Sequence, residues 1–217
     1  IKPISTKTHF IILMHPKEQR KIKNGTGLMT KLQLKNSEII IGVDFTDNKR
    51  VNEILNNKKN VSLLLYPGKD NFNLSERKSS EISSFMGETP NIFILDGTWP
   101  FARKMLKLSK NLQNIKRVSF DNEIKSKFII KQQPESLCLS TIESVYTIIN
   151  LLKEGKLEQC QTEHFLIPFK KMIEHQVECI INPHNNKYRP SKKKIITPKN
   201  IYKKRTERNM IFEQIKR

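Results

Sequence analysis

The stretch 91–105, NIFILDGTWPFARKM, brings together side chains that could bind and orient a ligand. An apolar run ends at Asp96, and Gly97, Thr98 and Trp99 follow before a helix-like pattern begins. A carboxylate can accept a proton, a glycine lets a ligand approach the backbone closely, and an indole ring can stack on a nucleobase. The residues alone leave two alternatives open, because Asp96 could simply cap a turn and Trp99 could lie in the core.

Polar and aromatic residues follow two other apolar runs in the same way. His15 and Lys17 come after the run 9–14, and Tyr66-Pro67-Gly68 ends the run 61–66. In parallel sheets, ligands bind outside the carboxyl ends of the strands, where loops meet helix N-termini. We therefore expect these segments to lie at one edge of a sheet, together with Asp96.

Two further segments could hold an anion. The segment 134–143, PESLCLSTIE, predicts an extended loop that leads to Ser140 and Thr141 at a helix N-terminus, which attracts carboxylate or phosphate groups. Asn-Gly-Thr-Gly at 24–27 predicts a turn whose backbone N–H groups could face an anion. This turn is not the glycine fingerprint of a dinucleotide site, so no dinucleotide is inferred.

The elements that must position these residues alternate between two kinds of pattern. Strand-length apolar runs are separated by segments with helical spacing, which is the pattern of a mostly parallel sheet covered by helices on both faces. The sequence therefore predicts an α/β fold. The expected strands are 9–14, 38–43, 61–66, 91–95 and 115–120. The clearest expected helices are 98–112, 140–155 with a capping box and a glycine stop, and 162–181 with one apolar stripe.

The charge of the chain points to a polyanionic partner. Lys and Arg number 40 against 21 Asp and Glu, which leaves a net charge of +19. Residues 182–217 contribute +10 of this charge and contain few apolar residues, so we expect a basic tail, helical near 200–215, that becomes ordered on a polyanion. Nucleic acid is the favoured partner and an anionic membrane surface the second. Compositional drift towards lysine is the alternative explanation of the charge.

The cysteines and the apolar runs exclude several other classes of protein. Cys138, Cys160 and Cys179 are too far apart for a metal knuckle or a disulfide framework, so no metal is predicted and a reducing compartment is expected. No run reaches the ~20 apolar residues that span a bilayer, and the first residues do not resemble a signal peptide. We expect a soluble, cytoplasmic protein; its oligomeric state is not predicted.

The motifs in combination resemble one known family. LDGTWPFARKMLKLSKNL (95–112) resembles the signature of the DTW-domain family, and HPKE (15–18), Thr-Gly (26–27), LLYPG (64–68) and LSTIE (139–143) occur in the order that this family shows. The resemblance covers roughly residues 8–180. It implies a tRNA-uridine aminocarboxypropyltransferase, which transfers the 3-amino-3-carboxypropyl group of S-adenosylmethionine to ring nitrogen 3 of a uridine and releases methylthioadenosine. It also implies a SPOUT-like fold with a C-terminal knot that holds the cofactor.

The resemblance gives each candidate residue an expected role. Asp96 would accept the imide proton or orient the uracil, with Thr98 and Trp99 beside it as catalytic residues. The expected cofactor-binding residues are Tyr66, Pro67, Gly68, Asp96, Gly97, Leu137, Cys138, Leu139, Ser140 and Thr141. The expected RNA-binding residues are His15, Lys17, Arg103, Lys104, Lys192, Lys193 and Lys194. The expected division is a catalytic domain, 1–181, and a basic extension, 182–217.

This chain departs from the family pattern in three ways, one of which is a basic tail longer than the motifs require, and two other functions remain open. Many members carry a cysteine cluster upstream of these motifs, and many have arginine where this chain has Leu28. No metal and no ligand role for residue 28 are therefore assigned. The open alternatives are an S-adenosylmethionine-dependent RNA methyltransferase of the same fold, and a non-catalytic RNA-binding module in which Asp96 only caps a helix.

Overall fold

The computed structural model describes residues 2–21, 25–68, 71–121 and 139–181. The chain divides into two units, residues 1–169 and 170–217. The boundary falls twelve residues before the predicted one, inside the last helix of the described residues, Ile167–Ile181. Since 182–217 lie outside the described residues, the division into a catalytic domain and a basic extension stays a prediction, as does the tail.

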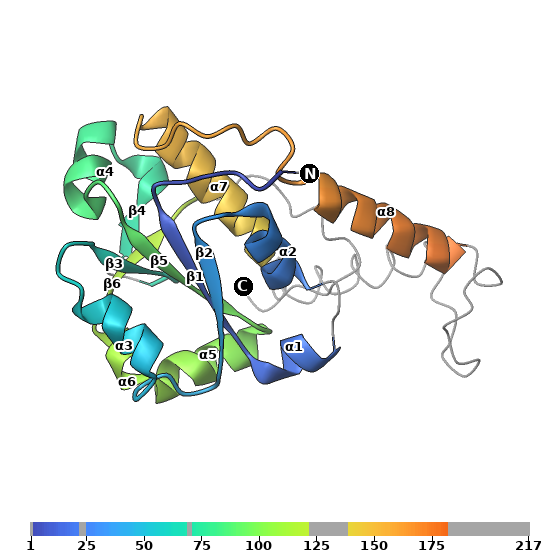
Figure 1. Cartoon of the computed structure of the whole chain (residues 1–217), viewed down its shortest axis with the longest axis horizontal. Coiled ribbons are helices and arrows are strands. Elements are labelled where there is room, and N and C mark those ends of the chain that lie inside the picture. The colour runs from blue at the N-terminus through green and yellow to red at the C-terminus, as the bar shows by residue number, and fades with distance from the viewer. Residues whose placement is uncertain (1, 22–24, 69–70, 122–138, 182–217) are drawn as a thin grey trace, which may run out of the picture. The chain divides into compact units, whose positions relative to one another are not determined.

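Six parallel strands form one open sheet in the first unit. The strand order is β2-β1-β5-β3-β6-β4, so β1 and β5 lie side by side near the middle (Figure 1). This confirms the predicted α/β class; the predicted knot involves residues outside the described part and stays a prediction. The strands are β1 His9–Met14, β2 Ser37–Ile41, β3 Ser62–Leu65, β4 Asn71–Asn73, β5 Asn91–Asp96 and β6 Lys116–Ser119.

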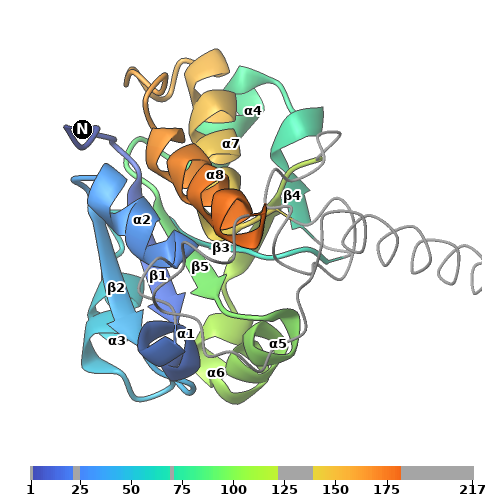
Figure 2. The same ribbon diagram turned by 90° about the vertical axis from the view of Figure 1, so that its right-hand side faces the viewer.

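Helices cover both faces of this sheet. Figures 1 and 2 show α3, α5 and α6 on one face and α2, α4 and α7 on the other. The helices are α1 Pro16–Lys21, α2 Thr26–Gln33, α3 Lys49–Asn56, α4 Ser79–Met86, α5 Trp99–Leu108, α6 Lys110–Gln113, α7 Thr141–Glu154 and α8 Ile167–Ile181, and a 3₁₀ turn spans Leu74–Glu76.

The alternation of side chains along each strand builds a separate core on each face. On the α5 face, Ile11, Leu64 and Phe93 pack in one cluster with apolar residues of α3, α5 and α6. Their neighbours along the strands, such as Ile12 and Ile94, are also buried, and they point to the α7 face. Because both faces are covered, the strands read as unbroken apolar runs, which is why the sequence located them well.

The sequence analysis missed several elements, and β4, α4 and the start of α2 show why. β4 is only three residues long, and its single apolar residue stands between two asparagines. Helix α4 is rich in serine and buries only Ile82 and Met86, so its apolar stripe is short. Helix α2 begins at Thr26-Gly27, inside the segment that was predicted to be a turn. Glycine has a low helix propensity, so residue propensities do not predict a helix that begins at this point.

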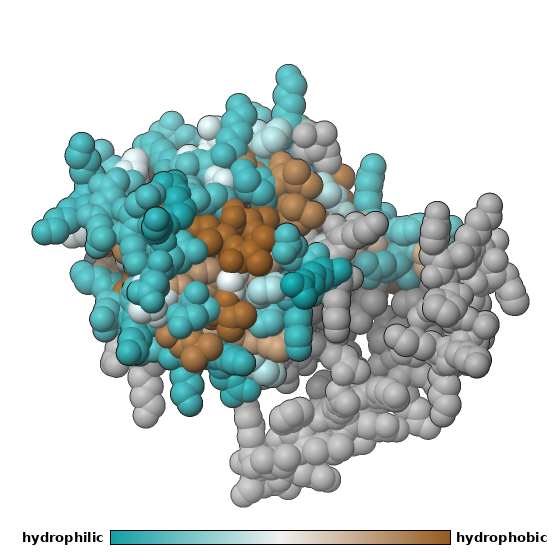
Figure 3. All heavy atoms as spheres, turned by 60° about the horizontal axis from the view of Figure 1, so that its bottom comes forward, coloured by the Kyte–Doolittle hydropathy of each residue, from teal (hydrophilic) through white to brown (hydrophobic). Residues whose placement is uncertain are grey.

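The surface agrees with the high charge of the chain. Apart from the grey residues, hydrophilic side chains surround several apolar areas on the face that Figure 3 shows. Among the described residues, no helix has the length and apolar character that crossing a bilayer requires.

A buried carboxylate ties the start of the chain to the segment after α7. Glu158 is buried, and its two oxygens accept hydrogen bonds from the backbone N–H of Lys7 and from the N–H and hydroxyl of Thr8, at 2.7–3.1 Å. These contacts fix the residues that lead into β1. A buried acceptor with several donors is costly to replace, because each lost bond leaves a dehydrated donor.

We therefore predict that Glu158→Gln lowers the free energy of unfolding by about 1.5–3 kcal/mol, because one amide end cannot accept these hydrogen bonds. Urea unfolding followed by circular dichroism measures the change. The control is Glu88→Gln on the exposed loop after α4, which should change stability by less than about 0.5 kcal/mol. Equal effects of the two variants would contradict the role of Glu158.

Candidate functional site

Asp96 lies at the carboxyl end of β5, next to the end of β1. Met14 and Asp96 are partners in the parallel ladder, and the backbone N–H of His15 donates to the carbonyl of Asp96 at 2.9 Å. The carboxylate points to the α7 face, where its Oδ1 accepts a hydrogen bond from the Thr141 hydroxyl at 2.5 Å. The side chain is 7% exposed. Asp96 is thus a buried, hydrogen-bonded acid at the edge where the sequence predicted it.

Helix α2 packs its first turn against the same carboxylate. A Cβ atom on Gly27 would lie 2.5 Å from Oδ2 of Asp96 and 3.0 Å from the methyl group of Met14. Only a glycine therefore permits this approach. Since α2 also packs on α7, the N-termini of two helices converge on Asp96, and both favour a negative charge there.

The start of α7 is organised by its own capping interactions. The carboxylate of Glu143 accepts from the backbone N–H of Ser140 at 2.9 Å and from its hydroxyl at 2.6 Å, as the predicted capping box requires. Gly155 follows the last residue of α7, as predicted. Leu139, Ser140 and Thr141 are partly buried; Leu137 and Cys138 lie outside the described residues.

Two aromatic rings lie on the opposite, α5 side of the same sheet edge. Trp99 begins α5, and its ring meets that of Tyr66 edge to face, with centroids 6.0 Å apart. Both rings are partly buried, so Trp99 is not a fully buried core residue. Burial raises the pKa of Tyr66 above its usual value, while the charges of Arg103 and Arg117 act to lower it.

Arg117 is a candidate site residue that the sequence analysis missed. It lies in β6, and its guanidinium carbon is 5.7 Å from the centre of the Tyr66 ring. One of its terminal nitrogens comes so close to Gly68 that a Cβ there would be 3.0 Å away. The only signal in the sequence was a lone arginine in a weak apolar run. Pro67, Gly68 and Thr98 at this edge are exposed.

A third group of contacts surrounds His15, after β1. The imidazole stacks on the Phe101 ring with centroids 4.1 Å apart, and its Nδ1 accepts from the backbone N–H of Lys17 at 3.1 Å. Lys17 Nζ lies 4.9 Å from the centre of the Phe101 ring. Burial lowers the pKa of His15 below its usual value, and the charges of Lys17 and Lys104 lower it further. The stack on Phe101 and the hydrogen bond from Lys17 thus fix the His15 ring at the start of α1.

Gly97 lies between these groups. A Cβ on Gly97 would be 3.3 Å from Phe101 and 3.5 Å from His15, so this glycine lets the chain turn closely from β5 into α5. The side chains of Lys17, Arg103 and Lys104 are exposed beside it. The sheet edge therefore combines an acid on one side with aromatic rings and cations on the other. Lys192, Lys193 and Lys194 lie outside the described residues.

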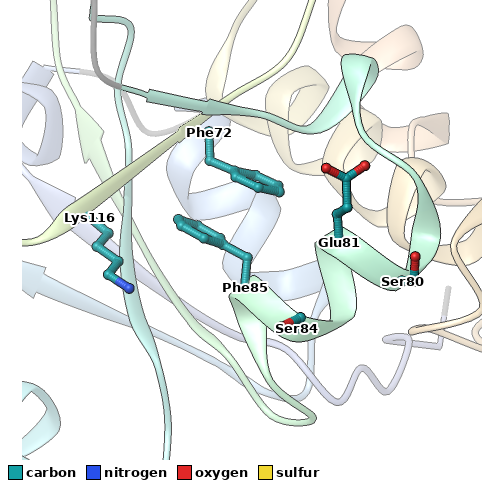
Figure 4. Close-up of a pocket in the computed structure, with 6 residues that line it drawn as sticks. All are labelled: Phe72, Ser80, Glu81, Ser84, Phe85 and Lys116. Atoms are coloured by element: carbon teal, nitrogen blue, oxygen red, sulfur yellow. The ribbon is translucent and has the colours of Figure 1, made fainter.

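Two pockets lie away from this edge. The larger, of about 520 Å³, is shallow and is lined by residues of β4, α4 and β6, among them Phe72, Phe85 and Lys116 (Figure 4). Its two phenyl rings stack on each other, and Lys116 and Arg77 lie over their outer faces, so the rings are covered. The smaller, of about 150 Å³, is at the amino ends of β1 and β5. Neither includes a residue that the sequence analysis selected.

No group of three or more His, Cys, Asp or Glu in the described ranges is arranged to hold a metal ion. Cys160 and Cys179 are free and only partly buried.

The comparisons with known proteins agree with the resemblance. The chain is 27% identical over 181 residues to tRNA-uridine aminocarboxypropyltransferase 2 of Macaca fascicularis (81% of this chain, 57% of the relative). It is 25% identical to the mouse protein of the same name (82% and 58%) and 27% identical to that of Drosophila melanogaster (85% and 71%). The chain thus spans less than three fifths of the length of the first two relatives.

No solved structure matches the chain significantly. The family model described as DTW domain matches residues 1–177, which is most of the sequence. This chain therefore belongs to the DTW domain family.

Proposed function

We propose that this protein is a tRNA-uridine aminocarboxypropyltransferase, which uses S-adenosylmethionine as donor and modifies ring nitrogen 3 of a tRNA uridine. The observation that supports this most is the buried carboxylate of Asp96 at the sheet edge, within a family whose named relatives carry this activity. The proposal includes a SPOUT-like fold with its knot near α7, a cytoplasmic location and a basic extension that contacts tRNA.

The residues at the sheet edge are of the kinds that such a donor requires. The partly buried rings of Tyr66 and Trp99 offer apolar surface to an adenine. Pro67, Gly68, Gly97 and the segment 137–141 would border it with backbone groups. Bound S-adenosylmethionine supplies an electrophilic carbon attached to a sulfonium, which needs no further activation. The task left to the protein is to orient the two substrates and to take up one proton.

We assign the proton to Asp96. The imide N–H of uridine is weakly acidic, and a carboxylate within hydrogen-bond reach can accept its proton or hold the ring. Thr141 fixes one oxygen, Oδ1, and the approach of Gly27 limits the space around the other. The carboxylate is thus held in one orientation, with the negative charge favoured by the N-termini of α2 and α7. Thr98 and Trp99 follow directly and would contact the bound substrates.

We assign the phosphate contacts to the cations on the α5 side. Lys17, Arg103 and Lys104 are exposed at the carboxyl edge, and His15 supports Lys17 through the stack on Phe101. Together with Lys192, Lys193 and Lys194 of the tail they would bind the backbone of a tRNA.

The nature of the reaction is tested by its products. Protein incubated with tRNA and S-adenosylmethionine should release methylthioadenosine and leave a uridine heavier by one aminocarboxypropyl group, as detected by mass spectrometry of nucleosides. Release of adenosylhomocysteine would instead show a methyltransferase. Tight RNA binding with no affinity for the donor would show a non-catalytic RNA-binding module.

The role of Asp96 is tested by a pair of variants. Asp96→Asn removes the charge but keeps an oxygen that can accept from Thr141, so we expect turnover to fall by about 10²–10⁴-fold with little loss of stability. Thr141→Val removes the hydrogen bond but keeps the acid, and turnover should fall much less. If both variants lost stability alike and Asp96→Asn kept normal turnover, Asp96 would be only a structural link between β5 and α7.

The RNA-binding role of the exposed cations is tested by salt dependence. The triple variant Lys17→Gln, Arg103→Gln, Lys104→Gln should have a shallower slope of log K against log [salt]. The magnitude of the slope should decrease by about 0.7–0.9 for each phosphate that the variant no longer binds. Filter binding of tRNA over a range of salt concentrations measures this slope. The matched control is Lys58→Gln, Lys59→Gln in the exposed turn before β3, at the opposite edge of the sheet, where an unchanged slope is expected. Equal slopes for all three proteins would contradict the assignment.

A further inference from the structure

Arg117 differs from the other arginines of the described residues. It is the one among them whose side chain is partly buried, while the others are exposed. Arg50 pairs with Glu38 and Arg77 pairs with Glu81, whereas no carboxylate of the described residues pairs with Arg117. A partly buried arginine is more favourable with a counter-charge beside its guanidinium than without one. The cation–π contact with Tyr66 offsets only about 0.5–2 kcal/mol. An anion bound here would pair with this guanidinium.

The contacts of Arg117 hold its guanidinium in place. The Tyr66 ring lies on one side, and a terminal nitrogen lies so close to Gly68 that a Cβ atom there would be 3.0 Å away and would displace it. The planar fork is therefore largely fixed before a ligand arrives, so that fewer degrees of freedom are lost on binding. The guanidinium of Arg117 lies next to the loop that follows β3, and its neighbour Tyr66 pairs with Trp99.

The two hydroxyl groups at the start of α7 already donate to carboxylates of the protein. The hydroxyl of Thr141 donates to Asp96, and that of Ser140 donates to Glu143. Neither proton is available to a ligand. The aminocarboxypropyl donor carries one carboxylate. This group is not at the reacting carbon, and a different residue must bind it.

Resting on the proposed function, we propose that Arg117 binds the carboxylate of the aminocarboxypropyl donor, and that Tyr66 and Gly68 hold its guanidinium ready for this. A guanidinium matches a carboxylate with two parallel hydrogen bonds. A partly buried position suits a small ligand, whereas RNA phosphates are reached by the exposed Lys17, Arg103 and Lys104. Through this contact the protein would bind the donor by the same aminocarboxypropyl group that it transfers.

Isothermal titration calorimetry with three probes tests this contact without relying on turnover. The probes are S-adenosylmethionine, its decarboxylated form, which lacks only the carboxylate, and methylthioadenosine, which lacks the whole aminocarboxypropyl group. The wild type should prefer the carboxylated donor by about 10- to 100-fold, the range for a charged hydrogen-bonded pair. Arg117→Gln should reduce this preference to less than about 3-fold and leave methylthioadenosine binding unchanged. Arg117→Lys should be intermediate, since it keeps the charge but not the fork.

Two further variants guard against an effect on folding. Arg77→Gln is the matched control, because Arg77 also lies over an aromatic ring but is paired with Glu81; it should keep the full preference. Gly68→Ala pushes on the end of the Arg117 side chain without removing any charge, so it should weaken the preference while thermal unfolding stays unchanged.

The outcomes separate this inference from the proposed function. A wild type that binds neither donor would overturn both. A wild type with the preference and an Arg117→Gln variant that keeps it would overturn only the role of Arg117. The same follows if Arg117→Gln leaves the preference intact and instead lowers the salt slope of tRNA binding by about one, because Arg117 would then be a phosphate ligand.

Discussion

The hydrogen bond between Thr141 and Asp96 is the contact on which the arrangement of the site depends. It joins residues 45 positions apart and fixes the start of α7 over the end of β5. A buried carboxylate requires such partners, because an isolated charge away from water is strongly unfavourable. The approach of α2 at Gly27 completes the enclosure. The interaction that orders this end of the fold therefore also sets the orientation of the acid proposed for catalysis.

The alternation of side chains along β3 and β5 separates two kinds of chemistry at this edge. Asp96 points to the α7 face, whereas Tyr66 packs with the cluster on the α5 face, beside Trp99 and Arg117. A ligand that crosses the carboxyl edge would meet an acid on one side and rings and guanidinium groups on the other. The two halves belong to different helices, so their spacing is set by how α5 and α7 pack on one sheet.

Much of the fold and part of the site could be predicted from the sequence. Long apolar runs located five strands, and the capping pair Ser140 and Glu143 with Gly155 located α7, because these signals are local. The motif around Asp96 indicated the candidate site. By contrast, β4, α2 and α4 carry weak local signals, and their formation depends on packing against the rest of the unit. Gly27 and Arg117 had no recognisable role until their neighbours were known.

The sequence by itself determined the α/β class, the strong positive charge and the position of the acid at a strand end, because each follows from composition or from the spacing of neighbouring residues. Only the tertiary structure decided that Thr141 and Gly27 meet Asp96, that Trp99 meets Tyr66 rather than filling the core, and that Arg117 is held against Gly68 without a carboxylate partner among the described residues. The physical reason is that these contacts join residues far apart in the chain, whose distance is set by strand order and helix packing and leaves no local pattern.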